Sequence, residues 1–204
     1  MTAGLLMTMR GTPFVFEGQE LGMTNGDFAD LTEVMDIESH NIYAMAKKLA
    51  IPAPIRWKMI KRTSRDNART PMQWTAGENA GFTDGTPWLK VNANHTEVNT
   101  ESEAADENGV LAFWKKMIKL RKTSRILREG SFRAVYEGSA VYAFVRELDG
   151  KKILSVCNMT GKKVRMPACL TSWNKTAVSN YSTVGKKYMK PFEFRIMVQR
   201  EESV

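Results

Sequence analysis

Residues 64–74 read Ser-Arg-Asp-Asn-Ala-Arg-Thr-Pro-Met-Gln-Trp, and the interpretation of the chain starts from this stretch. It places two guanidinium groups, a carboxylate, two amide side chains and an indole close together. The Asp66-Asn67 pair is typical of a turn, because short polar side chains form hydrogen bonds with their own backbone. Pro71 disfavours helical geometry in Thr70. We therefore expect an irregular loop that is unusually rich in hydrogen-bonding groups.

The side chains of this loop suit recognition of a polyhydroxylated ligand. Arg65 and Arg69 each offer a rigid fork of donors, Asp66 accepts hydroxyl protons, and Trp74 offers an apolar face to a sugar ring. The same composition also fits a loop that is held together by its own Arg-Asp pair. The residue types alone leave both interpretations open.

The loop resembles the SRDNARTPMQW segment of bacterial α-glucosidases of the oligo-1,6-glucosidase and trehalose-6-phosphate hydrolase type, which belong to the α-amylase superfamily (glycoside hydrolase family 13). Four further blocks resemble this family in the same order. They are GTPFVFEGQELGMTN at 11–25, DIE and NIY within 36–43, AGFTDGTPWL at 80–89 and VN at 91–92. The resemblance implies an enzyme that hydrolyses short α-glucosides, chiefly α-1,6-linked, with retention of configuration.

The resemblance also implies roles for single residues. Arg69 matches the arginine that reaches the glucose unit in the innermost subsite, Asp66 would orient Arg69, and Arg65 would assist. Glu20 would accept a hydrogen bond from a sugar hydroxyl or hold the loop. The family often has Glu where this chain has Gln19, so the division of roles between these two neighbours stays open. No catalytic and no metal-binding residue is assigned, because the motifs that carry the family's nucleophilic Asp, acid/base Glu and third Asp do not occur in this sequence.

The order of predicted elements fits the end of a barrel. The apolar run 13–16 lies between Gly11-Thr12 and Glu17-Gly18, and it predicts a strand buried on both faces. By resemblance it is the eighth strand of a (β/α)8 TIM barrel, in which binding groups follow the strand ends. Residues 24–63 predict a mainly helical excursion that is interrupted at 51–54. Residues 110–118 carry the apolar spacing of an amphipathic helix, which the resemblance makes the last helix of the barrel.

Beyond Gly130 the apolar period changes from 3.6 to 2. Asp149-Gly150 stands between two apolar runs, which strongly indicates a hairpin. Residues from about 130 onward therefore predict a small antiparallel β domain, in the position of the family's C-terminal β-sandwich. The predicted fold class is α/β plus all-β, with residues 1–128 as the C-terminal part of a catalytic barrel and residues 129–204 as a β-sandwich.

A complete barrel takes about 250 residues, so the barrel predicted here is incomplete. We interpret the chain as the C-terminal portion of an α-glucosidase that is inactive alone. Its expected partners are a small oligosaccharide or disaccharide and the missing N-terminal barrel portion. A trehalose-6-phosphate hydrolase fragment and a non-catalytic carbohydrate-binding or interaction module stay open as alternatives.

The composition of the chain bears on three other classes of protein, namely nucleic-acid-binding, membrane and zinc-binding proteins. The chain is 43% hydrophobic, which is enough for a core, and it has a formal net charge of +8. Many of its cations fall on the polar face of the predicted helix, and no nucleic-acid-binding motif accompanies them, so we expect no nucleic-acid partner. We also expect no membrane partner, since no apolar run reaches the length of a span and the N-terminus lacks a signal-peptide pattern. Two distant Cys and two distant His residues predict no zinc site, no cofactor and a cytoplasmic location.

Overall fold

The computed structural model describes residues 1–199, which form two compact units. Unit 1 joins Met1–Phe14 to the chain from Phe113 onward, and unit 2 consists of Val15–Ala112. The division falls within helix α5 (Val110–Thr123). The boundary predicted between residues 128 and 129 stays a prediction.

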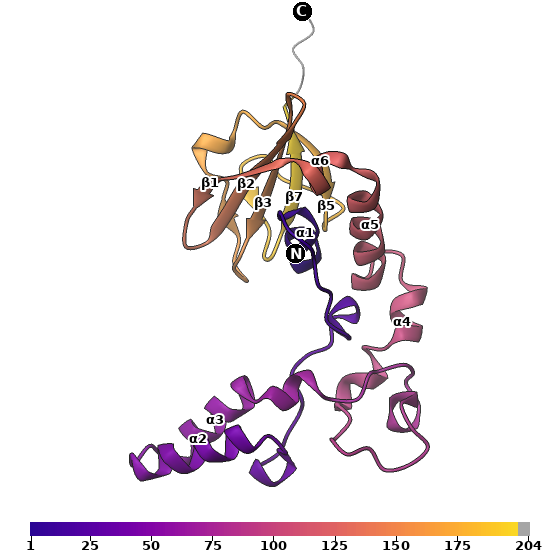
Figure 1. Ribbon diagram of the computed structural model, residues 1–204, viewed down its shortest axis with the longest axis vertical. Helices are drawn as coiled ribbons and strands as arrows, with labels where there is room; N and C mark the ends of the chain where they lie inside the picture. Colours follow the sequence, from indigo (N-terminus) through magenta and orange to yellow (C-terminus); the bar gives the residue numbers. More distant parts are fainter. Residues whose placement is uncertain (200–204) are drawn as a thin grey trace, which may run out of the picture. The chain divides into compact units, whose positions relative to one another are not determined.

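Unit 1 is built on an antiparallel five-stranded sheet in the order β1-β2-β3-β7-β5 (Figure 1). A separate two-stranded sheet pairs β4 with β6. The strands are β1 (Ser131–Glu137), β2 (Val141–Leu148), β3 (Lys151–Asn158), β4 (Val164–Arg165), β5 (Lys175–Ser179), β6 (Tyr188–Met189) and β7 (Phe194–Val198). The antiparallel arrangement predicted from the sequence is therefore present, while its description as the sandwich that follows a barrel end stays a prediction.

The hairpin predicted at Asp149-Gly150 is confirmed. Leu148 pairs with Lys151, so the loop between β2 and β3 contains two residues. Their φ angles are 49° and 73°. A two-residue turn with left-handed backbone matches the right-handed twist of the strands, and Asp-Gly tolerates it well.

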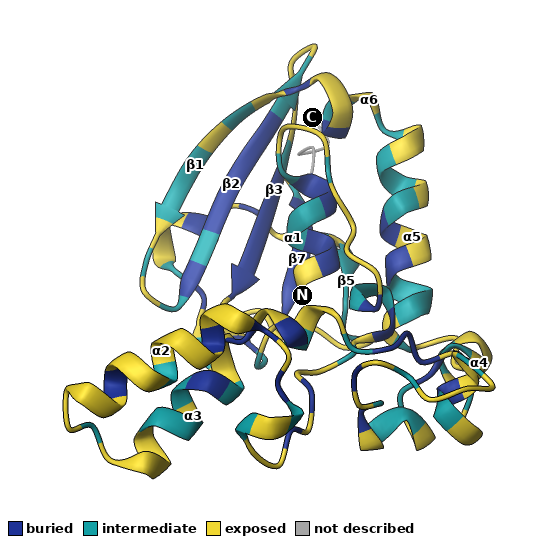
Figure 2. Cartoon of the chain, turned by 60° about the horizontal axis from the view of Figure 1, so that its bottom comes forward, coloured by how far each residue is buried: buried dark blue, intermediate teal, exposed yellow. Residues whose placement is uncertain are grey.

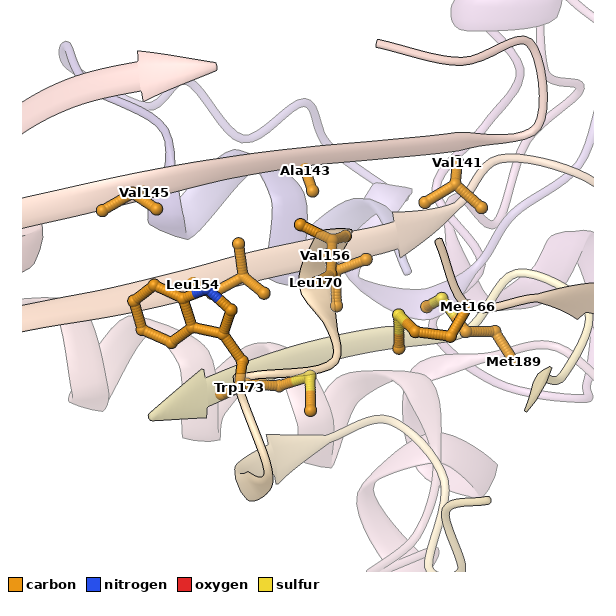
Figure 3. Packing of buried hydrophobic residues seen from close by; sticks show 10 residues of the cluster. Val141, Ala143, Val145, Leu154, Val156, Met166, Leu170, Trp173 and Met189 are labelled. Atoms are coloured by element: carbon orange, nitrogen blue, oxygen red, sulfur yellow. The ribbon is translucent and has the colours of Figure 1, made fainter. Parts of the chain in front are cut away.

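The main sheet buries apolar side chains on both faces, because neighbouring residues of a strand point to opposite sides. Figure 3 shows the cluster on one face, to which β2, β3 and the segment around helix η6 (Ala168–Leu170) contribute. That cluster comprises Val141, Ala143, Val145, Leu154, Val156, Met166, Leu170, Trp173, Met189 and Met197. The cluster on the other face comprises Ala3, Met7, Trp114, Met117, Cys157, Phe194 and Ile196.

Helix α1 (Thr2–Thr8) lies against β3 and β7 (Figure 1). Gly4 permits this close packing, since a Cβ atom at this position would lie 2.2 Å from the ring of Phe194. The end of α1 is tied to the sheet by Arg146, which is fully buried on β2. Its guanidinium donates to the carbonyl oxygens of Thr8 (2.7 Å) and Leu127 (2.9 Å). Arg146 therefore joins α1, β2 and helix α6 (Arg125–Glu129).

Unit 2 contains the helices α2 (Ile37–Lys48), α3 (Ala53–Thr63) and α4 (Thr100–Ala105). Its short 3-10 turns are η1 (Gln19–Leu21), η2 (Leu31–Glu33), η3 (Arg65–Ala68), η4 (Glu78–Gly81) and η5 (Ala93–Thr96). Helices α2 and α3 pack on each other, and much of their surface is exposed in Figure 2. A small core of Phe28, Val34, Ile60 and Leu89 holds unit 2 together.

The strand predicted at residues 13–16 is wrong for this structure. These residues have no regular secondary structure and pair with no strand among residues 1–199. Phe14 is 83% exposed and Phe16 is 58% exposed. A strand needs a neighbour for its backbone hydrogen bonds and apolar faces, and the described part of the chain provides none for this segment.

Candidate substrate-binding site

The predicted loop at residues 64–74 begins with the 3-10 turn η3. The Ser64 hydroxyl accepts a hydrogen bond from the Asp66 amide (3.3 Å), as a capping residue does. Asn67 joins the loop to two other segments. Its Oδ1 accepts from the Gly26 amide (3.0 Å), and its Nδ2 donates to the carbonyl of Lys61 (3.0 Å). The turn chemistry expected from Asp66-Asn67 thus serves contacts between distant parts of unit 2.

Asp66 anchors this loop to the start of α2. The residue is fully buried, and its Oδ2 accepts from the backbone amides of Met35 (2.7 Å) and Asp36 (2.9 Å). These two amides immediately precede α2, where backbone donors lack partners within the helix. A carboxylate at this end of a helix is also favoured by the helix dipole. Asp66 therefore has a structural task besides any contact with Arg69.

Arg69 is held loosely by Asp66. One Nη1–H group donates to Asp66 Oδ1 over 3.4 Å, and the Arg69 side chain is 42% exposed. Its other N–H groups have no hydrogen-bond partner among residues 1–199. A guanidinium has five N–H donors in a fixed plane, so most of this donor capacity is available to a ligand.

Arg65 points its hydrogen bonds to the first turn of α2. Its Nε and Nη2 donate to Asp36 Oδ1 (3.0 and 2.7 Å), and Nη2 lies 3.2 Å from Glu38 Oε2. Burial opposes ionisation of Asp36, but the hydrogen bonds from Arg65 and Ser39 and the charge of Arg65 outweigh it. Together they lower the pKa of Asp36 to about 2. The hydrogen bond to Asp36 and its negative charge raise the pKa of Arg65 in turn.

Asp36 is the residue of this cluster that the sequence interpretation missed. It caps α2, because its Oδ2 accepts from the amide and the hydroxyl of Ser39 (3.3 and 2.8 Å). The signal in the sequence was the residue type itself, because Asp is among the residues preferred at the N-cap of a helix. The sequence pattern predicted only a mainly helical excursion over residues 24–63, and the cap explains why α2 starts at Ile37.

Glu20 forms no hydrogen bond or ion pair with the three residues predicted to act with it, among the described residues. It belongs to the turn η1. Gly18 and Gly22 stand directly before and after this turn, and their left-handed φ angles are 85° and 74°. Within residues 1–199, no hydrogen bond or ion pair connects Glu20 to residues 64–74, and its buried Oε2 atom lacks a partner. An unpaired buried carboxylate oxygen is costly, so this atom requires a donor that the described residues do not supply.

The second half of the loop is fixed through Gln73, which the sequence interpretation also missed. Gln73 is fully buried, and its Nε2 donates to Asn94 Oδ1 (3.2 Å) and to the carbonyl of Val98. Next to it, Trp74 is 44% exposed, and Trp88 is 60% exposed. These indoles leave apolar area in contact with solvent, as expected of a surface on which sugar rings stack.

Residues 1–199 contain neither a cluster of metal-ligating side chains nor a helix that could span a membrane. No group of three or more His, Cys, Asp and Glu side chains is arranged to hold a metal ion. No helix in this part of the chain combines the length and the apolar character that spanning a membrane requires.

The sequence of this chain is similar to those of known proteins. Residues 1–130 match the model of the alpha amylase catalytic domain. The chain belongs to the alpha-amylase family. It is 36% identical over 211 residues to the oligo-1,6-glucosidase of Halalkalibacterium halodurans. This alignment covers 99% of this chain and 38% of that protein. It is 38% identical over 162 residues to the trehalose-6-phosphate hydrolase of Bacillus subtilis, and this alignment covers 79% of this chain and 29% of that protein.

Solved structures of this family resemble the chain over nearly its whole length. The trehalose-6-phosphate hydrolase TreA of Bacillus licheniformis is 33% identical with a TM-score of 0.87, over 96% of this chain and 37% of that one. The isomaltulose synthase PalI of Klebsiella sp. LX3 is 32% identical with a TM-score of 0.87, over 98% of this chain and 37% of that one. The chain therefore spans less than two fifths of the length of these alpha-amylase family proteins.

Proposed function

We propose that this chain is the C-terminal portion of a retaining α-glucosidase that hydrolyses short α-glucosides, chiefly α-1,6-linked. In this proposal residues 64–74 form part of the subsite that holds the terminal glucose unit. The observation that carries it is the exposed guanidinium of Arg69, which is oriented from one side by the buried Asp66. Arg69 would donate to the sugar hydroxyls with the N–H groups that Asp66 does not use.

The other predicted residues have different roles in this proposal. Arg65 fixes the first turn of α2 through Asp36, so it acts as a positioning residue rather than as a sugar contact. Glu20 offers an unpaired carboxylate oxygen to a sugar hydroxyl. Trp74 and Trp88 offer apolar faces for further sugar units.

We further propose that the catalytic carboxylates lie outside this chain. Retaining hydrolysis needs a nucleophile and an acid/base with carboxyl groups about 5–5.5 Å apart. The buried carboxylates beside the loop are both engaged, because Asp66 accepts two backbone amides and Asp36 accepts from Arg65 and Ser39. The isolated chain is accordingly expected to be inactive, and an N-terminal barrel portion is expected to complete the site.

A chimera tests this proposal. This chain would replace the matching portion of the Halalkalibacterium halodurans oligo-1,6-glucosidase, and kcat/KM for isomaltose would be measured. Arg69→Ala removes charge-assisted hydrogen bonds to the sugar and is expected to lower kcat/KM at least about 100-fold. Arg62→Ala is the matched control, because Arg62 is exposed on α3, and it should change kcat/KM less than about twofold.

Two results would contradict the proposal. Equal effects of the Arg69 and Arg62 substitutions would remove Arg69 from the subsite. Turnover of p-nitrophenyl α-glucoside by the isolated chain, with contaminants excluded, would place the catalytic carboxylates within these residues.

Trehalose-6-phosphate hydrolase is the second candidate, and it is favoured by the 38% identity to the enzyme of Bacillus subtilis. A second chimera with that enzyme as host separates the two. Higher activity on trehalose 6-phosphate in this host than on isomaltose in the first host would favour the second candidate. Binding of isomaltose by the isolated chain, with neither chimera active, would instead favour a non-catalytic carbohydrate-binding module.

A further inference from the structure

Unit 1 contains a cavity of about 770 Å³ beside η6, β5 and residues 184–187. Its floor is apolar and belongs to the cluster of Figure 3, including Leu170, Trp173 and Met197. Sites for small molecules typically measure about 300–1,000 Å³ and combine apolar walls with a few polar groups. The cavity thus has the size and the floor of a small-molecule site.

One wall of this cavity is held in place by Arg195, a buried residue of β7. Its Nε and Nη2 donate to the Glu193 carboxylate (2.8 and 2.9 Å). Its Nη1 and Nη2 also donate to the carbonyl oxygens of Gly185 (2.7 Å) and Tyr188 (2.8 Å). Charge-assisted hydrogen bonds of this length fix the segment 185–188 to the sheet, so this wall is built before any ligand arrives.

The rim of the cavity is positively charged. Lys175, Lys186 and Lys187 line it, all three are exposed, and none forms an ion pair within the described residues. The charge of Arg195 is balanced by Glu193, whereas the rim lysines have no such neighbour in sequence. Residues 150–192 contain nine Lys and Arg residues and no Asp or Glu. A cavity lined by one sign of charge concentrates ligands of the opposite sign.

We propose that this cavity binds a small phosphorylated molecule with a ring or apolar body, of the class of a sugar phosphate. The ammonium groups of the rim act as point charges for the phosphate, and the apolar floor with Trp173 receives the body. An extended polyanion fits less well, because it binds along a charged groove through its backbone charges and would leave the apolar floor without a contact. The site is separate from residues 64–74, and no step of the proposed hydrolysis depends on it.

Calorimetric titration of the purified 204-residue chain tests this proposal. Glucose 6-phosphate is the probe, and glucose, inorganic phosphate and heparin are titrated alongside it. Glucose 6-phosphate is expected to bind more tightly than either glucose or phosphate, because only it uses both rim and floor. Its affinity should fall as ionic strength rises.

Paired variants locate the site. Lys186→Ala/Lys187→Ala is expected to weaken glucose 6-phosphate binding at least about tenfold, since it removes two of the three rim charges. Lys151→Ala/Lys152→Ala makes the same change of charge on β3, outside the cavity lining, and should leave the affinity within about twofold. Arg69→Ala should also leave it unchanged, which separates this site from the proposed glucoside subsite.

Several outcomes would overturn the proposal. One is an equal loss of affinity for glucose 6-phosphate in both lysine double variants, which would mean that the ligand is attracted by the overall positive charge and not by this cavity. Another is binding of glucose as tight as that of glucose 6-phosphate, and a third is no binding of glucose 6-phosphate at millimolar concentration. Binding of heparin alone would mark a surface for polyanions instead. The lysines are exposed, so unchanged circular dichroism melts in the variants will show that folding is not the cause.

Discussion

Replacing Asp66 with alanine is expected to loosen the start of α2 while leaving the sheet of unit 1 unchanged. The Oδ2 atom of this fully buried carboxylate accepts from the amides of Met35 (2.7 Å) and Asp36 (2.9 Å). A hydrogen bond to a charged group contributes about 1.5–3 kcal/mol. Two such bonds give an expected loss of about 3–6 kcal/mol in the free energy of local opening. The weak contact with Arg69 adds little, because the Arg69 side chain is 42% exposed.

The conservative variant Asp66→Asn separates the hydrogen bonds from the charge. The amide oxygen of asparagine can take the place of Oδ2 and still accept from Met35 and Asp36, although without a full negative charge. We therefore expect Asp66→Asn to cost about 1 kcal/mol, well below the cost of the alanine variant. Asp27→Ala serves as the control, because Asp27 is an exposed residue of unit 2 with one ion pair at 3.9 Å.

Hydrogen exchange followed by mass spectrometry measures this loss locally. Peptides covering residues 34–48 of Asp66→Ala should exchange at least about 100-fold faster, since 1.4 kcal/mol corresponds to a factor of ten. Peptides from β2 and β3 should keep their rates. An acceleration below tenfold at residues 34–48, or an equal acceleration in β2 and β3, would refute the role of Asp66 as the anchor of α2.

Three further predictions concern acid stability, packing and thiol reactivity. The pKa of Asp36 is about 2 in the folded chain against 3.8 ordinarily, so its contribution is present above pH 4 and is lost as the pH falls towards 2. After discounting for the exposed partner, thermal melts of the wild type should lose about 1 kcal/mol over this range, and melts of Asp36→Asn should not. Gly4→Ala should lower the free energy of unfolding by about 1–3 kcal/mol through overpacking, because its Cβ would lie 2.2 Å from the Phe194 ring. The loss would be measured as a lower melting temperature. Burial raises the pKa of Cys157 to about 12 while Cys169 is exposed, so a colorimetric thiol reagent at pH 8 should modify one thiol of the native chain and both after unfolding.

The features that the sequence predicted well are local ones. The Asp149-Gly150 hairpin depends on two residues and their immediate neighbours, because the paired strands β2 and β3 lie directly before and after them in the chain. The interruption predicted at residues 51–54 is also present, since α2 ends at Lys48, although α3 already begins at Ala53. The density of donors in residues 64–74 was also visible in the sequence, and the contact between Asp66 and Arg69 is present.

The features that the sequence did not reveal depend on contacts between distant segments. Asp66 and Arg65 form their shortest hydrogen bonds with residues about thirty positions earlier in the chain. Their residue types suggested ligand contacts, because a ligand and a helix terminus offer the same donors and acceptors. Only the fold distinguishes Arg69, which donates one weak hydrogen bond to Asp66, from Arg65, whose Nε and Nη2 both donate to Asp36.

The wrong strand at residues 13–16 follows from the same physical difference. An apolar run indicates that a segment is suited to burial on both faces, but the burial itself must come from neighbours elsewhere in the fold. β2 has such neighbours in β1 and β3, and it forms a strand. Phe14 and Phe16 have none among residues 1–199 and remain largely exposed. The relatives are more than twice as long as this chain, so the neighbours of this segment are to be sought in the part of those proteins that the chain does not match. Pairing of residues 13–16 in the chimera, seen as slowed exchange of their amides, is the result that this reasoning requires.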